Sequence, residues 1–200
     1  ERDNIIAQNK RHVEALFSEY QPTTGVGSPI ERVRLTLSRD GRHVLIPKYI
    51  ATASAFAAML DYPSVEDYIE DKGYDKNEIY DVITRLRLKY DFEYWAATCA
   101  TIFDKTSGRE VKFILRKAQR KLLKVLVETA FALRPIRVIL VKARQWGGST
   151  LTQMYIKWMQ EYRHPNGWNA AVITQADSTS KKIQYTKNSI ATDVVTLSDV

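Results

Sequence analysis

Apolar and polar residues alternate in two different ways along this chain of 200 residues. Between residues 33 and 37 apolar positions alternate as in a strand, a turn signal follows at 39–41, and a second apolar run covers 43–46. This order predicts a β-hairpin. Helical patterns surround the hairpin, over roughly 3–20, 64–72 and 76–90. The pattern therefore predicts a small α+β region over residues 1–90.

Capping residues support two of these helices. Ser64 is a candidate N-cap and Gly73 a candidate stop for the helix over 64–72. Asp75 precedes the next helix, with Glu78 three residues later, as in a capping box. Residues 21–29, which contain Gly, Pro, Ser and Thr, predict a loop or linker.

The second half of the chain changes to an α/β pattern. A helical period over 111–127 is followed by a β-branched run at 136–141, which predicts a buried strand. A glycine-bearing turn leads into an amphipathic helix over 149–164, and a second strand is predicted at 168–174. A crossover of this length suits two parallel strands in a right-handed unit. We expect the start of a parallel sheet with flanking helices over 91–200.

The turn between the first strand and its helix carries candidate chemistry. Backbone N–H groups at a strand–turn–helix junction point at an anion, and the helix dipole favours negative charge there. Against the phosphate-loop pattern G-x-x-x-x-G-K-[ST], Gly147 falls on the second glycine and Ser149 on the magnesium-binding hydroxyl. Lys142 replaces the first glycine, and Gly148 occupies the lysine position. The alternative is an ordinary turn between a core strand and a surface helix.

The sequence Lys-Ala-Arg-Gln-Trp-Gly-Gly-Ser-Thr at 142–150 resembles the deviant Walker A loop of the large terminase subunit of tailed bacteriophages. In that family the basic residue can lie early in the loop, so the resemblance implies Arg144 or Lys142 as the catalytic cation. A glutamine upstream of the loop contacts adenine in the family, and Gln119 is the matching residue. The implied nucleotide ligands are Gln119, Gln145, Trp146, Gly147, Gly148, Ser149 and Thr150, with Ser149, or else Thr150, holding Mg²⁺ through ATP.

The resemblance covers about residues 90–190 and includes the segment 91–115 that leads into the glutamine helix. It implies a P-loop NTPase-like parallel sheet and, in the full protein, an ATPase that translocates double-stranded DNA into a procapsid and also carries a nuclease. Implied partners are the portal protein, the small terminase subunit and further copies in a ring, in the host cytoplasm and transiently at the procapsid portal. No hydrophobic run ending in an acidic pair follows 168–174, so we expect a chain cut before the Walker B strand and poorly active alone.

Two other classes of function stay open. A helicase-like P-loop ATPase is one, although such proteins usually keep the loop lysine that Gly148 replaces here. A non-catalytic module that binds DNA or protein, with a purely structural glycine turn, is the other.

Charge is uneven between the two halves of the chain. Residues 1–100 carry 13 Lys/Arg against 16 Asp/Glu, a net charge of −3, whereas residues 101–200 carry 17 against 7, a net charge of +10. Basic residues gather in the glutamine helix, where we expect them on one face: Arg116, Lys117, Arg120, Lys121 and Lys124. Such a face suits non-specific contact with DNA phosphates, for which Arg120, Lys121 and Lys124 are the candidates, or else contact with a protein or with solvent alone.

Other classes of site receive little support. Cys99 is the single cysteine, which excludes a disulfide framework and favours a reducing cytoplasm. The three histidines lie far apart, and no apolar run approaches the ~20 residues of a membrane span. A cluster of carboxylates on the helix at 64–72 is expected to be solvated surface: Glu66, Asp67, Glu70 and Asp71.

Overall fold

A computed structural model describes residues 19–104, 108–141 and 146–163 of the chain. These residues form helices and two antiparallel strand pairs, which confirms a mixed α and β composition. The elements run in the order β1 (Arg32–Thr36), β2 (His43–Pro47), η1 (Lys48–Ile50), α2 (Ser54–Leu60), α3 (Val65–Lys72), α4 (Lys76–Tyr90), α5 (Phe92–Thr98), β3 (Thr101–Asp104), β4 (Arg109–Lys112), α6 (Lys117–Phe131), α7 (Gly148–Trp158) and η2 (Met159–Arg163).

The predicted N-terminal hairpin is confirmed. β1 and β2 pair antiparallel, with Leu35 opposite Val44 and Val33 opposite Ile46. Leu35 and Ile46 are buried, 1% and 0% exposed, because each lies on the face of the hairpin that packs on the neighbouring helices. Gly41 adopts a φ of 85° in the connecting turn, a conformation that glycine reaches without steric cost.

The predicted caps of α3 and α4 are also confirmed. The Ser64 hydroxyl accepts a hydrogen bond from the Asp67 N–H (3.2 Å), and Gly73 ends α3 with a φ of 65°. The Asp75 carboxylate accepts a hydrogen bond from the Glu78 N–H (3.0 Å) at the start of α4. Most of the helix predicted over 3–20 lies outside the described residues.

The helix predicted over 111–127 begins later than expected. Residues 109–112 form β4, which pairs with β3, and α6 begins only at Lys117. Val111, Phe113 and Leu115 alternate as in a strand, while Leu115 and Leu122 also match a helical period, so the two patterns overlap here. The short helices α2 and α5 were not predicted from the sequence.

The strand predicted at 136–141 is not formed in this structure. These residues belong to no helix or strand, and Ile139 and Val141 are 97% and 95% exposed. A strand exists only with a hydrogen-bonded neighbour, and the segment at 168–174 that was predicted to share its sheet lies outside the described residues. Both sheets in the described part of the chain are antiparallel pairs, with no parallel strands.

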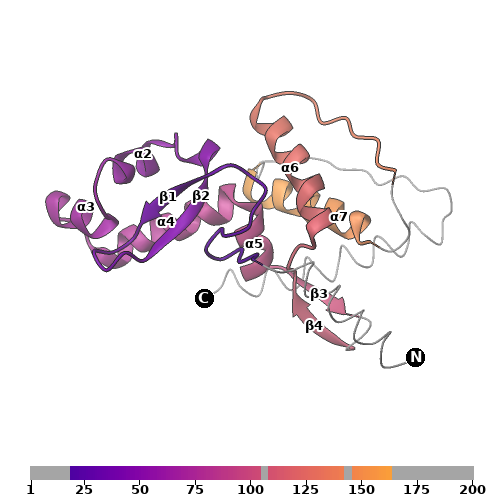
Figure 1. Ribbon diagram of the computed structural model, residues 1–200, viewed down its shortest axis with the longest axis horizontal. Helices are drawn as coiled ribbons and strands as arrows, with labels where there is room; N and C mark the ends of the chain where they lie inside the picture. The colour runs from indigo at the N-terminus through magenta and orange to yellow at the C-terminus, as the bar shows by residue number, and fades with distance from the viewer. Residues whose placement is uncertain (1–18, 105–107, 142–145, 164–200) are drawn as a thin grey trace.

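Two hydrophobic clusters form the core. Figure 1 shows β1, β2 and α2–α4 at one end of the molecule, α6 and α7 at the other, and α5 between them. The first cluster includes Leu35, Ile46, Phe56, Val65 and Ile83. The second includes Tyr20, Phe92, Trp95, Leu123, Leu151 and Trp158.

The junction between the clusters lies near residue 91. Asp91 ends α4 and is also the N-cap of α5, and Tyr49 packs against both clusters. Tyr20 and Ile30, although early in the sequence, belong to the second cluster. The division into regions 1–90 and 91–200 stays a prediction.

Candidate functional site

The glycine turn before α7 leaves backbone N–H groups available to a ligand. Gly147 is the N-cap of α7 with a left-handed φ of 84°, and no side chain caps the helix. Its carbonyl accepts the first helical bond, from the Leu151 N–H (3.1 Å). The N–H groups of residues 148–150 therefore have no partner within the helix. A left-handed residue followed by a helix N-terminus is a geometry that binds anions.

Residue 147 must be glycine for two reasons. Residues with a side chain rarely adopt its positive φ. A Cβ atom at this position would also lie 2.6 Å from the Nε2 atom of Gln119. A side chain at residue 147 would therefore displace the amide end of Gln119 rather than α6 itself.

Gln119 is brought to the glycine turn from 28 residues away in the sequence. Its side chain is buried, 4% exposed. The Nε2 atom donates a hydrogen bond to the Gly147 carbonyl (3.0 Å), and the Oε1 atom accepts one from the Arg116 N–H (2.8 Å). The amide thus holds the turn through backbone groups, and contact with adenine stays a prediction.

The remaining candidate nucleotide ligands differ in accessibility. Ser149 is exposed at the start of α7, Thr150 is half-buried, and Gly148 is buried. Trp146 is half-buried and packs against the second hydrophobic cluster. The candidate cations Lys142 and Arg144 lie outside the described residues, and so does Gln145.

The prediction of one basic face on α6 is wrong for Arg120, whereas Lys117, Lys121 and Lys124 follow the i, i+4, i+7 spacing of a shared face. Arg120 is only 7% exposed, and its Nη1 atom donates to the Gly27 carbonyl (2.7 Å). Lys121 is exposed, and Lys124 is half exposed beside Glu128, at 3.7 Å. Successive helix positions differ by about 100°, which turns Arg120 toward the core while Lys121 points to solvent.

A buried ionic cluster, consisting of Arg32, Asp91 and Glu93, was missed by the sequence analysis. The side chain of Arg32 is 4% exposed and those of both carboxylates 0%. The Arg32 guanidinium donates to Asp91 through Nη1 (2.8 Å) and Nη2 (2.9 Å), and to Glu93 through Nη2 (2.6 Å). Burial raises the pKa of Glu93, and the opposing effect of Arg32 is smaller.

Neighbouring groups complete this cluster. The Tyr20 hydroxyl donates to Glu93 (3.1 Å), and so does the Ser28 hydroxyl. Burial also raises the pKa of Tyr20, with the Glu93 carboxylate adding to the effect. Arg87 lies 4.0 Å from Asp91. The sequence signal for this cluster was two carboxylates interleaved with core aromatic residues at 91–95.

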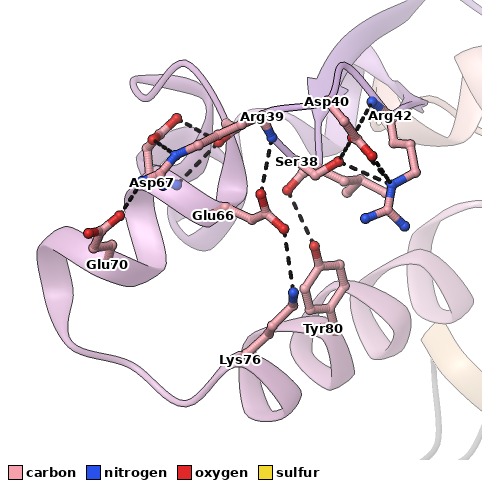
Figure 2. Close-up of polar contacts among 11 residues, drawn as sticks. Ser38, Arg39, Asp40, Arg42, Glu66, Asp67, Glu70, Lys76 and Tyr80 are labelled. Carbon is pink, nitrogen blue, oxygen red and sulfur yellow. Dashed lines mark hydrogen bonds and ion pairs between the residues drawn. The ribbon is translucent and has the colours of Figure 1, made fainter.

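The acidic face of α3 is paired with cations. Figure 2 shows Arg39, from the β1–β2 turn, pointing at this helix, where its guanidinium pairs with Asp67 (2.8 Å) and with Glu70. Lys76 pairs with Glu66 at 3.4 Å. Arg39 is 62% exposed, so these pairs lie in water and contribute little to stability.

Residues 19–104, 108–141 and 146–163 carry neither a metal-binding cluster nor a membrane-spanning helix. No group of three or more His, Cys, Asp or Glu side chains there is arranged to hold a metal ion. None of the helices there has the length and apolar character needed to cross a bilayer.

Comparison with known proteins gives no match. The sequence matches no protein-family model, and neither the curated proteins nor the solved structures give a significant match.

Proposed function

We propose that the chain is part of an ATP-driven DNA-packaging motor of the large terminase type, and that the turn at 146–150 binds the phosphates of ATP. In this proposal the complete protein hydrolyses ATP to move double-stranded DNA into a procapsid. In the same proposal residues 136–141, which form no strand in the described structure, pair with residues 168–174 as neighbouring parallel strands of a P-loop NTPase-like sheet.

One observation carries the proposal. The left-handed Gly147 precedes an 11-residue helix whose first N–H groups have no partner within that helix, and Gln119 is hydrogen-bonded to that same glycine. The family resemblance had paired the glutamine, as an adenine ligand, with the glycine turn, as a phosphate ligand. Their direct contact places the two candidate ligands side by side, which supports the proposal.

The described residues suit a phosphate group. The N–H groups at 148–150 supply donors, and the exposed Ser149 supplies a hydroxyl for the Mg²⁺ that accompanies ATP. The positive charge that phosphoryl transfer requires is assigned to Arg144 or Lys142. An adenine contact would use the remaining hydrogen-bonding capacity of the Gln119 amide.

The wider roles follow from the family resemblance. Lys121 and Lys124 remain candidates for contact with DNA phosphates, whereas the buried Arg120 does not suit that role. Proposed partners are double-stranded DNA, the portal protein, the small terminase subunit and further copies in a ring. The proposed location is the cytoplasm of the bacterial host, with transient attachment to the procapsid portal.

A non-catalytic module that binds DNA or protein is the second candidate. It is favoured by the two backbone hydrogen bonds of the Gln119 amide, which give this residue a structural role without any nucleotide. Under this alternative the turn binds no ATP.

Titration of the full chain with ATP and Mg²⁺ by isothermal calorimetry separates these candidates. We expect Ser149→Ala and Arg144→Ala each to weaken binding by about ten-fold or more, since each removes a polar or charged phosphate contact. Thr84→Ala, which removes an exposed hydroxyl on α4, is the matched control and should bind as the unmodified chain does. Absence of binding, or equal binding by all four proteins, would contradict the proposal.

A further inference from the structure

Two consecutive residues of α6 are polar, buried and directed to different parts of the molecule. Gln119 and Arg120 are 4% and 7% exposed. Gln119 holds the glycine turn before α7, whereas Arg120 contacts the N-terminal turn formed by residues 20–27. A rotation of about 100° between adjacent helix positions separates the two directions.

Arg120 makes a two-sided contact with the N-terminal turn. Its Nη1 atom donates to the Gly27 carbonyl (2.7 Å), and its guanidinium lies 4.1 Å from the centre of the Tyr20 ring. A cation–π contact at this distance, combined with a hydrogen bond from the same guanidinium, favours arginine over lysine. Tyr20 in turn donates to Glu93 of the buried ionic cluster (3.1 Å), so Arg120 is attached to a part of the core that is itself fixed.

The N-terminal turn leaves little room for movement. The Gln21 N–H donates to the Val26 carbonyl (2.9 Å) across it. Gly27 has a φ of 73°, and a Cβ atom there would lie 1.8 Å from the Glu19 carbonyl oxygen. Residues 20–27 therefore form a fixed backbone segment for contact with α6.

The glycine turn before α7, by contrast, depends on what holds it. The Gly147 carbonyl accepts hydrogen bonds from both Gln119 and the Leu151 N–H. α7 has no capping side chain of its own. The position of Gln119, and so of α6, therefore decides how well the first turn of α7 is ordered.

We propose that Arg120 is a positioning residue for the candidate phosphate-binding turn. Its contacts hold α6 against residues 20–27 and so position the Gln119 amide. The amide in turn fixes Gly147, so that the N–H groups after Gly147 are oriented to bind an anion. That the turn binds a phosphate rests on the proposed function. That Arg120 controls the order of the turn rests on the contacts of α6 alone.

Hydrogen–deuterium exchange of the full chain tests the link without any ligand. Arg120→Met keeps the length of the side chain and removes its contacts with residues 20–27. Within 148–151 we expect the Leu151 amide, which is bonded to the Gly147 carbonyl, to exchange about three- to ten-fold faster, the loss of one net hydrogen bond. Gln119→Ala should give the same change, and the double variant no further change. Arg120→Lys, which retains the charge, should give a partial change.

Two controls separate positioning from loss of overall stability. Val125→Ala lies on the same helix with a 48% exposed side chain and should leave exchange at 148–151 unchanged. The amide of Leu37, bonded across the β1–β2 turn to Arg42, should exchange equally in all variants. If Arg120→Met does not fold, Arg120→Lys carries the test.

The inference is overturned if exchange over 148–151 does not respond to either Arg120 variant, rises together with that of Leu37, or rises additively with Gln119→Ala. Titration with ATP and Mg²⁺ then tests the ligand, and we expect Arg120→Met to weaken binding by about three- to ten-fold. If the unmodified chain binds no ATP while exchange behaves as expected, the proposed function fails and the positioning role stands.

Discussion

Replacement of Arg32 by methionine tests the buried ionic cluster most directly. The change removes the cation from two carboxylates whose side chains are 0% exposed, and methionine keeps most of the apolar stem. Asp91 and Glu93 would then be buried next to each other without their shared partner. Buried charges without a close counter-ion are unfavourable, and Arg87, 4.0 Å from Asp91, is left to compensate only one of the two.

The geometry sets the expected size of the effect. Arg32 makes three hydrogen bonds to carboxylate oxygens, of 2.6 to 2.9 Å, and a fourth to the Leu45 carbonyl (2.7 Å). Removing one partner from a buried ion pair typically destabilises a protein by about 3–5 kcal/mol. Three charge-assisted bonds at the low end of about 1.5–3 kcal/mol each lead to a similar value. We expect the free energy of unfolding to fall by about 3–5 kcal/mol at neutral pH.

The loss of stability caused by Arg32→Met should increase from acidic to neutral pH. Burial already raises the pKa of Glu93, and loss of Arg32 removes the main group that lowers it. A carboxyl whose pKa is higher in the folded state contributes stability below its unfolded pKa and loses it as pH rises through the folded value. The variant should therefore be least destabilised near pH 4.5 and most destabilised at neutral pH.

Urea unfolding followed by tryptophan fluorescence, at several pH values, measures both quantities. Adding Glu93→Gln to Arg32→Met should recover part of the lost stability, because one of the two unpaired charges is then absent. A loss below about 1 kcal/mol at neutral pH, the range of an exposed ion pair, with no change toward pH 4.5, would refute the reasoning.

Three further predictions concern single side chains. Tyr155→Phe should leave the free energy of unfolding unchanged or raise it slightly, because the buried Tyr155 hydroxyl has no hydrogen-bond partner in the described part of the chain; a loss above about 1 kcal/mol on chemical denaturation would contradict this. Ser64→Ala should lower stability by about 1 kcal/mol in the same assay, because α3 loses its N-cap, and an unchanged unfolding midpoint would count against the cap. Gly147→Ala should speed amide exchange over 148–151 and abolish ATP binding, since its Cβ would meet Gln119 at 2.6 Å; exchange and affinity equal to the unmodified chain would show that the turn tolerates a side chain.

The helix ends and the first hairpin were predictable because short-range chemistry determines them. Ser64 and Asp75 cap the helices that follow them, and the β1–β2 pairing follows the alternation of apolar residues. These contacts join residues a few positions apart, so few competing arrangements exist. The glycine turn before α7 belongs to the same class, since it combines a left-handed glycine with a helix start.

Two predicted elements, the strand at 136–141 and the helical start at 111–115, were wrong for other reasons. Residues 136–141 have strand composition but no pairing partner among the described residues, and a ladder cannot form on one side only. The apolar residues at 111–115 fit both a strand period and a helical period. Residues 109–112 form a strand because they pair with β3. The strand at 136–141 needed a partner beyond the described residues, whereas residues 109–112 were decided by a local hairpin with residues 101–104.

The sequence alone therefore determined the first hairpin, the caps of α3 and α4 and the glycine turn, together with the residues to suspect in it. Only the tertiary structure decided that Gln119 holds that turn and that Arg120 is buried against residues 20–27, 93 positions away from Gly27. It also brought Arg32 together with Asp91 and Glu93, across separations of 59 and 61 residues. Burial of a charged side chain depends on which distant groups surround it, because only a complete set of partners offsets the loss of water.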